Sequence, residues 1–320
     1  MIQKNTQKIV ILATGGTIAG VAQDPTAPEN YQSGQLAVVD LMHTIDTEAH
    51  EVVTEQVSQI DSKDMDEGLW RKLAQRCAYW LAQDCVQGLV VTHGTDTLEE
   101  TAFFLNAVLP DDKPVVLTCA MRAANAPDSD GVQNLQSAFD LVANASATGV
   151  LVVCAGEVHA AHEIQKTHSQ RLNPFTSGEA GPIGLMRDGV FERLREPSKL
   201  NCLERVPSLS TVLACEPWPH VELVMSHAST NGGLVLAMLA NKPPDGWVVA
   251  GTGNGTLHRS LQHALENAQA LGAVVMRTSR CAQGGVQSRS DDVFQHAGLM
   301  TAVQARVRLM LELIYQRKGR

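Results

Sequence analysis

The chain has 320 residues, a formal net charge of −9 and a 44% share of hydrophobic residues. A single hydrophobic core stops growing at about 250 to 300 residues, so this length predicts two domains. The acidic balance argues against a nucleic-acid partner, because phosphate binding needs clustered Lys and Arg, and the basic cluster at residues 317–320 follows a predicted helix.

The distribution of apolar residues argues against a membrane protein. No run approaches the roughly 18 consecutive apolar residues of a membrane helix, and the polar residues 1–8 lead into a strand rather than a signal peptide. We therefore expect no membrane partner and a cytoplasmic location. The seven cysteines are scattered and form no C-x-x-C pair, so neither a disulfide framework nor a zinc site is predicted.

The first predicted strand ends in a glycine turn that carries two hydroxyl groups. Five apolar residues, 9–13, predict a strand covered on both faces, and Thr14-Gly15-Gly16-Thr17 follows directly. Glycines let another backbone or a ligand come close, so the turn is either a site at the carboxyl edge of a parallel sheet or a simple capped turn. Neither phosphate motif, G-x-G-x-x-G or G-x-x-x-x-G-K-[ST], is satisfied, and we expect no cofactor.

Residues 21–34 predict a loop long enough to act as a lid, because they are rich in Pro, Gly, Asn and Asp and lack periodicity. Its one aromatic residue, Tyr31, is either a surface anchor or part of the site. Short apolar strands then alternate with helices, which predicts βαβ units and a parallel, doubly wound sheet. The expected elements are strand 50–60, helix 64–82, strand 88–92, helix 98–108, strand 115–117, helix 131–145 and strand 149–154.

Secondary-structure signals weaken over residues 175–219, where five prolines are spaced along the chain, and we take residues 199–218 as an interdomain linker. Beyond it the alternation resumes, with strand 221–225, helix 232–240, strand 247–250, helix 257–271, strand 273–277 and a final helix over 301–316. The expected architecture is α/β. It has a larger N-terminal catalytic domain with a doubly wound, mostly parallel sheet, residues 1–198, and a smaller C-terminal α/β domain, residues 219–320.

A second threonine turn, His93-Gly94-Thr95-Asp96-Thr97, follows the strand at 88–92. In this order and at strand ends, the two turns resemble the two signatures of the bacterial-type L-asparaginase family. The resemblance extends over nearly the whole chain. It includes Tyr31, Ser62, the Ala120-Met121-Arg122 turn, Lys166 and the Gly253-Asn254-Gly255 turn.

The resemblance implies an amidohydrolase that converts L-asparagine to L-aspartate and ammonia through a threonine acyl-enzyme. It assigns Thr17 as the nucleophile, helped by Tyr31, and a triad in which an uncharged Lys166 accepts the proton of Thr95 beside Asp96. A threonine hydroxyl is a weak nucleophile at neutral pH and needs such a proton path. The residues alone leave open which threonine is acylated, and Lys166 alone fits a solvated surface lysine.

The same resemblance implies that Gly16, Ser62, Lys63, Ala120 and Asn254 contact the substrate, with Ser62 holding its α-carboxylate. By itself the Gly-Asn-Gly turn around Asn254 fits a turn and helix N-cap. In the family this asparagine comes from a neighbouring subunit, which implies a homotetramer built from two intimate dimers.

Two positions depart from the family pattern. Lys63 stands where the periplasmic enzymes usually carry Gln or Glu, and Arg289 lies near the place of a glutamate that reaches the substrate α-ammonium. Two cations beside an ammonium group are unfavourable. Either Lys63 pairs with Asp61 or Asp64, or the enzyme prefers an amide without a free α-amine, such as an N-acyl-asparagine or succinamate.

Other functions stay open from the sequence. Glutamine is an alternative substrate, and the amidase subunit of a tRNA-dependent amidotransferase is an alternative that the acidic charge disfavours. A non-catalytic small-molecule-binding α/β protein is a third, because residues 251–255 mimic part of a dinucleotide loop. His159, His162 and His168 lie close in sequence but lack the H-E-x-x-H pattern, so a polar loop is expected there and not a metal site.

Overall fold

The computed structural model describes residues 7–23, 30–43, 45–47, 50–143, 147–198 and 206–318. The chain divides into two compact units, Met1–Lys199 (unit 1) and Leu200–Arg320 (unit 2), and each has its own hydrophobic core. Within the described ranges, no helix is long and apolar enough to cross a membrane.

Unit 1 is built on an eight-stranded sheet with the strand order β12-β11-β8-β7-β6-β5-β1-β4. The strands β4, β1, β5, β6 and β7 run parallel, and β8, β11 and β12 are antiparallel. This confirms the predicted mostly parallel sheet. The bounds are β1 (Lys8–Gly15), β4 (Glu51–Ile60), β5 (Val86–Thr92), β6 (Pro114–Thr118), β7 (Gly149–Cys154), β8 (Glu157–Ala160), β11 (Gly184–Arg187) and β12 (Val190–Arg193).

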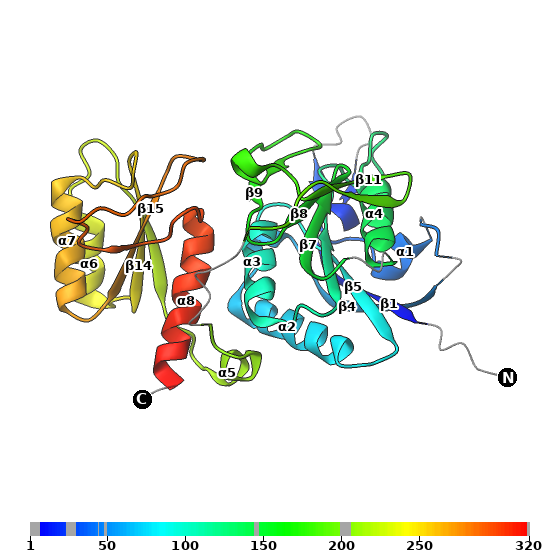
Figure 1. Ribbon diagram of the computed structural model, residues 1–320, viewed down its shortest axis with the longest axis horizontal. Coiled ribbons are helices and arrows are strands. Elements are labelled where there is room, and N and C mark those ends of the chain that lie inside the picture. Colours follow the sequence, from blue (N-terminus) through cyan, green and yellow to red (C-terminus); the bar gives the residue numbers. More distant parts are fainter. Residues whose placement is uncertain are drawn as a thin grey trace. The chain divides into compact units, whose positions relative to one another are not determined.

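Helices cover both faces of this sheet, as the doubly wound prediction requires. The helices are α1 (Val38–Met42), α2 (Glu67–Leu81), α3 (Leu98–Val108) and α4 (Gly131–Ala143). Figure 1 shows α1 and α4 on one face and α2 and α3 on the other. Ile9 and Ile11 of β1 pack in one cluster with Leu135 and Phe139 of α4. Because side chains alternate along a strand, Val10 points to the opposite face, so β1 is buried on both sides.

Short elements in unit 1 lie where the sequence predicts none. β2 (Val21–Ala22) and β3 (Tyr31–Gln32) pair within the predicted lid loop, of which residues 24–29 lie outside the described ranges. A second pair joins β9 (Gln165–Lys166) to β10 (Phe175–Thr176), and single 3₁₀ turns cover Thr17–Ala19, Ser62–Asp64 and Gly178–Ala180. The hairpin of β11 and β12 lies in the stretch of weak signals, although its Asp188-Gly189 turn is a recognisable hairpin signal.

Unit 2 has a four-stranded parallel sheet in the order β13-β14-β15-β16, and Figure 1 shows α6 and α7 on one face and α8 on the other. The fully buried Trp247 of β14 packs with Leu265 of α7 at the centre of its core. Helix α5 lies inside the predicted linker. The bounds are α5 (Leu209–Ala214), β13 (Val221–Met225), α6 (Gly233–Asn241), β14 (Gly246–Gly251), α7 (Arg259–Ala270), β15 (Val274–Ser279), β16 (Gln295–His296) and α8 (Ala302–Lys318).

Candidate active site

The two threonine turns meet at the carboxyl ends of β1 and β5. These strands are parallel neighbours, with Ala13 opposite Thr92, so both turns leave the same edge of the sheet. Gly16 has a φ of 82°, and a Cβ built on it would lie 2.4 Å from the backbone N of Gly94. Only glycine fits there, and the close approach of the two backbones brings Thr17 and Thr95 to one site.

Thr17 is held against Tyr31 at the base of the predicted lid. Thr17 begins a 3₁₀ turn, and its Oγ1 lies 2.8 Å from the Tyr31 hydroxyl in a hydrogen bond that either oxygen can donate. The Asn125 side chain fixes this base, because it accepts from the backbone N of Ala22 at 2.8 Å and donates to its carbonyl at 2.9 Å. The sequence gives no local sign of Asn125, because its partner lies 103 positions away.

Lys166 lies between Thr95 and Asp96. Its Nζ donates to Thr95 Oγ1 at 2.8 Å and to Asp96 Oδ1 at 2.6 Å, and its side chain is only 17% exposed. Lys166 is therefore not a solvated surface lysine. The three side chains predicted as a triad are brought together from β9 and from the turn after β5.

Glu99 positions the backbone of Lys166. Lys166 belongs to β9, where it pairs with Phe175, and its N–H donates to Glu99 Oε2 at 3.1 Å. Burial raises the pKa of Glu99 to about 7. The sequence suggests only a helix-dipole role for this acid in the first turn of α3, so its contact with Lys166 is a feature that sequence reasoning missed.

Ser62 forms a hydrogen bond with the second threonine turn, and Lys63 forms ion pairs with nearby acidic side chains. Ser62 is buried, and its Oγ accepts from the backbone N of Asp96 at 3.2 Å. Lys63 Nζ lies 2.7 Å from Asp61 and 3.6 Å from Asp64. In this arrangement the cation of Lys63 is paired with Asp61 and Asp64.

Ala120 is fully buried in the turn that follows β6. The Asp130 carboxylate shapes this turn by accepting from the backbone N of Met121 at 3.0 Å and of Arg122 at 2.9 Å. Because charge-assisted hydrogen bonds to backbone N–H groups are strong, Asp130 holds Ala120 in place. Asp130 lies in a polar loop, and composition alone does not single it out.

Asn254 and Arg289 lie on contacting loops of unit 2. The Asn254 amide donates to the carbonyl of Gln287 at 3.0 Å and accepts from its N–H at 2.7 Å. The Arg289 side chain is exposed, while its backbone N donates to Asp292 at 2.8 Å, and Asp292 forms an ion pair with the buried Arg277 at 2.5 Å. Asn254 is thus fixed within its own unit.

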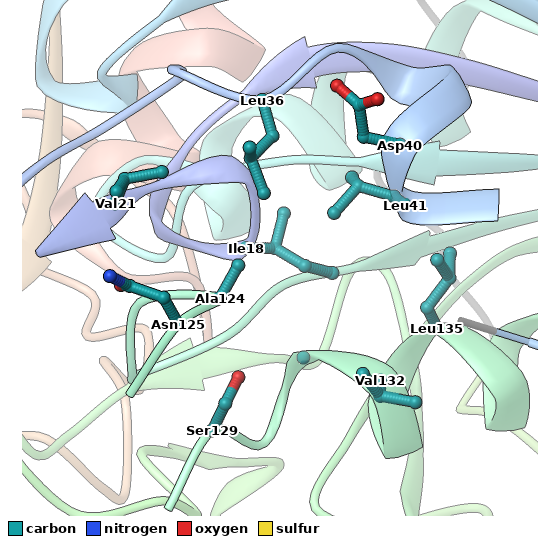
Figure 2. A pocket seen from close by; sticks show the side chains of 11 residues that line it. Ile18, Val21, Leu36, Asp40, Leu41, Ala124, Asn125, Ser129, Val132 and Leu135 are labelled. Carbon is teal, nitrogen blue, oxygen red and sulfur yellow. The ribbon is translucent and has the colours of Figure 1, made fainter. Parts of the chain in front are cut away.

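An apolar pocket lies beside the first threonine turn. Figure 2 shows Ile18, the residue after Thr17, projecting into it between Leu36 and Leu41 on one side and Val132 on the other. The polar side chains in its lining are Asp40, Asn125 and Ser129. The lining includes none of the candidate catalytic residues.

The described residues contain no group of three or more His, Cys, Asp or Glu side chains that is arranged to hold a metal ion. Of the three histidines that lie close in sequence, His159 is buried and forms a hydrogen bond with Ser177 at 2.9 Å, while the ring of His168 accepts from the backbone N of Gln170. His159 therefore lies in strand β8 and not in the predicted polar loop, whereas the ring of His168 bonds to the backbone of its own loop.

Comparisons with known proteins give matches over both units. Residues 8–199 match the family model "Asparaginase, N-terminal", and residues 220–318 match "Glutaminase/Asparaginase C-terminal domain". The chain is 35% identical to "L-asparaginase 2" of Escherichia coli, covering 95% of the chain and 88% of that relative, and 32% identical to "L-asparaginase 2" of Bacillus subtilis, covering 97% and 84%.

Among solved structures, the chain is similar to "Probable Cytoplasmic L-asparaginase from Campylobacter jejuni". The TM-score is 0.89 at 33% identity, with 96% of this chain and 95% of that chain covered. The family models, the relatives and the structure agree in fold and extent. The chain therefore belongs to the asparaginase family of amidohydrolases.

Proposed function

We propose that the enzyme hydrolyses the side-chain amide of L-asparagine to L-aspartate and ammonia through an ester on Thr17. The observation that carries this proposal is the paired arrangement at the sheet edge. One threonine, Thr17, lies 2.8 Å from the Tyr31 hydroxyl, and the other, Thr95, lies 2.8 Å from the Lys166 amine. Two activated hydroxyls at one site suit an acyl transfer in two steps.

In the first step, Thr17 Oγ1 attacks the amide carbon, the C–N bond breaks, and the hydroxyl proton leaves with the nitrogen as ammonia. In the second step, water attacks the β-aspartyl ester and Thr17 regains its proton. The backbone N–H groups of Thr17 and Thr95 have no hydrogen-bond partner within the described ranges, so both are free to donate to the oxyanion.

Lys166 is the proposed base for Thr95. It donates to both Thr95 and Asp96 in the structure, so it must first release one ammonium proton to solvent before its amine accepts the Thr95 proton. Asp96 orients the amine from the other side.

For substrate binding, we propose that Ser62 holds the α-carboxylate, and that Gly16 and Ala120 shape the space around the amide. The pairing of Lys63 with Asp61 leaves no free cation at that position to repel an α-ammonium group, which supports asparagine over N-acyl-asparagine or succinamate. Glutamine is a second candidate substrate, because a relative named "Glutaminase-asparaginase" from Pseudomonas fluorescens is 32% identical.

Ammonia release from a panel of amides tests this function. We expect asparagine to have the highest kcat/KM and Thr17→Ala to lose at least about 10³-fold in kcat. Thr14→Ala is the matched control, because the Thr14 hydroxyl donates to the carbonyl of Thr92 and takes no part in the chemistry. A wild-type rate equal to that of buffer on every amide would refute the proposal.

Mass spectrometry of a substrate-trapped enzyme identifies the acylated residue. We expect a mass increase on the peptide that contains Thr17. An adduct on Thr95 with Thr17 unmodified would reverse the two roles.

We propose that the enzyme is a homotetramer of intimate dimers in which Asn254 completes a neighbouring subunit's site. Support comes from α6, where Leu234 is 61% exposed and Leu236 is 47% exposed. A second copy of the chain packed on α6 would bury this apolar surface. Leu234→Asp is expected to dissociate the oligomer in sedimentation experiments and to reduce activity. Leu271→Asp, at an exposed position that follows α7, is the control.

We further propose a cytoplasmic location, which the similarity to the "Probable Cytoplasmic L-asparaginase from Campylobacter jejuni" supports. Cell fractionation tests it. Recovery of the enzyme with the periplasmic fraction would contradict it.

A further inference from the structure

A buried histidine directly precedes the second threonine turn. His93 is fully buried, and its Nδ1 lies 2.7 Å from the carbonyl oxygen of Gly94. Its Nε2 lies 3.0 Å from Thr101 Oγ1 in α3, and that hydroxyl also receives the Trp70 indole N–H at 2.9 Å from α2. Three hydrogen bonds therefore connect α2 and α3 to the backbone that carries Thr95.

The chemistry of the partners fixes the direction of these bonds. The Gly94 carbonyl only accepts, so His93 carries a proton on Nδ1, and the Trp70 indole only donates. Burial lowers the pKa of His93 to about 4, which leaves the ring neutral and Nε2 an acceptor for the Thr101 hydroxyl. Each bond in the series Trp70, Thr101, His93, Gly94 thus points the same way, and aligned hydrogen bonds strengthen one another.

We infer that His93 is a positioning residue that holds and polarises the peptide unit joining Gly94 to Thr95. A donor on the carbonyl oxygen of a peptide makes the N–H of the same peptide a stronger donor. That N–H belongs to Thr95, one of the two proposed oxyanion donors, and the same bond fixes the turn that presents the Thr95 hydroxyl to Lys166. This inference rests on the proposed function.

Two variants separate this role from simple filling of the core. His93→Asn keeps an N–H near the position of Nδ1, whereas the longer His93→Gln places its amide near the position of Nε2. Both leave a cavity and lower the melting temperature. Removing one oxyanion donor lowers kcat by about 10² to 10³-fold, and weakening that donor by losing its polarisation costs a part of that. We expect about a tenfold loss of kcat in His93→Gln, less than about threefold in His93→Asn, and a KM within about twofold of wild type in both.

Equal losses of kcat in the two variants, or losses that appear in KM alone, would show that His93 only fills space. Trp70→Phe removes the far end of the series while keeping an aromatic ring, and we expect it to lower kcat by less than His93→Gln does.

A measurement without substrate tests the hydrogen-bond direction. In wild-type enzyme labelled with ¹⁵N-histidine, NMR is expected to show one ring with its proton on Nδ1 that does not titrate between pH 5 and pH 9, and His93→Asn identifies this ring by removing its signals. A proton on Nε2, or titration near the ordinary value of about 6.5, would overturn the inference. If the wild type hydrolyses no amide, the proposed function fails, while this spectrum still decides how His93 is bonded.

Discussion

Gly16 and Gly94 pack backbone against backbone, so that the two threonine turns approach each other closely only because neither position carries a side chain. A Cβ on Gly16 would lie 2.4 Å from the Gly94 nitrogen, and a Cβ on Gly94 would lie 2.5 Å from Ser62 Oγ. Because rigid backbone, and not a flexible side chain, blocks Gly16, the distance between Thr17 and Thr95 depends directly on this contact.

Gly16→Ala should therefore reduce both activity and stability. The new methyl group forces the turns apart, and we expect the free energy of unfolding to fall by about 1 to 3 kcal/mol more than in the control, with kcat close to background. The control is Gly181→Ala, because Gly181 has nearly the same backbone angles (φ 68°, ψ −174°, against 82° and −175°) but nothing within 4 Å of its Cβ position. Equal losses of stability in chemical denaturation would show that backbone strain alone is responsible.

Tyr31→Phe removes the hydroxyl that lies 2.8 Å from Thr17 Oγ1. We expect kcat to fall by about 10²-fold, the lower end of the range for a group that assists proton transfer, while KM changes little. Steady-state ammonia release measures both constants. Tyr79→Phe is the matched control, since Tyr79 is an exposed side chain on α2, and a similar loss there would point to a general effect of removing a phenol.

Lys166→Met and Lys166→Arg separate the charge of Lys166 from its capacity to act as a base. Arginine keeps the positive charge beside Asp96 but does not lose its proton in proteins. We expect both variants to lose about 10² to 10⁴-fold in kcat. Lys113→Met, which removes a lysine that donates to the carbonyls of Leu81 and Gln83, should retain full activity. An active Lys166→Arg enzyme would show that only the charge matters.

Glu99 makes the stability of the enzyme depend on pH near neutrality. Its folded-state pKa of about 7 lies above the ordinary value of 4.5, so the folded protein binds the proton more tightly than the unfolded chain does. The contribution is fully present below pH 4.5 and is lost as the pH rises through 7, so the free energy of unfolding falls over that window. Glu99→Gln should flatten this slope in denaturation at about pH 5, 6, 7 and 8.

Glu67→Gln is the control for that experiment, because Glu67 occupies a first-turn position in α2 as Glu99 does in α3. We expect Glu67→Gln to keep the wild-type slope. A Glu99→Gln variant that also keeps it would mean that another group titrates over this range.

The parallel part of the fold was predictable because its strands are uninterrupted apolar runs. The bounds of β7 (Gly149–Cys154) and β13 (Val221–Met225) coincide with the expected ones. β8, β11 and β12 were missed for a physical reason. They are strands of only four residues, and their own sequence shows little periodicity.

In the candidate site, too, some features could be predicted from the sequence and others could not. The positions of Thr17 and Thr95 at a sheet edge were predictable because each lies in the turn that follows a buried strand. Two contacts were not predictable: the hydrogen bond from Lys166 N to Glu99, and the hydrogen bonds between Asn125 and Ala22. The paired residues are 67 and 103 positions apart, so local sequence patterns carry no information about them. Lys166 was predicted as a site residue only through the family resemblance.

The position of Lys166 on a short strand affects the temperature at which the enzyme loses activity. The proposed base stands on β9, a two-residue strand. Among the strands of the described ranges, β9 pairs only with the equally short β10, outside the eight-stranded sheet whose edge carries both threonine turns. Segments with so few backbone hydrogen bonds open at a lower free energy than the sheet core. Reversible thermal inactivation should therefore set in several degrees below the melting of the fold, while the threonine turns are still intact.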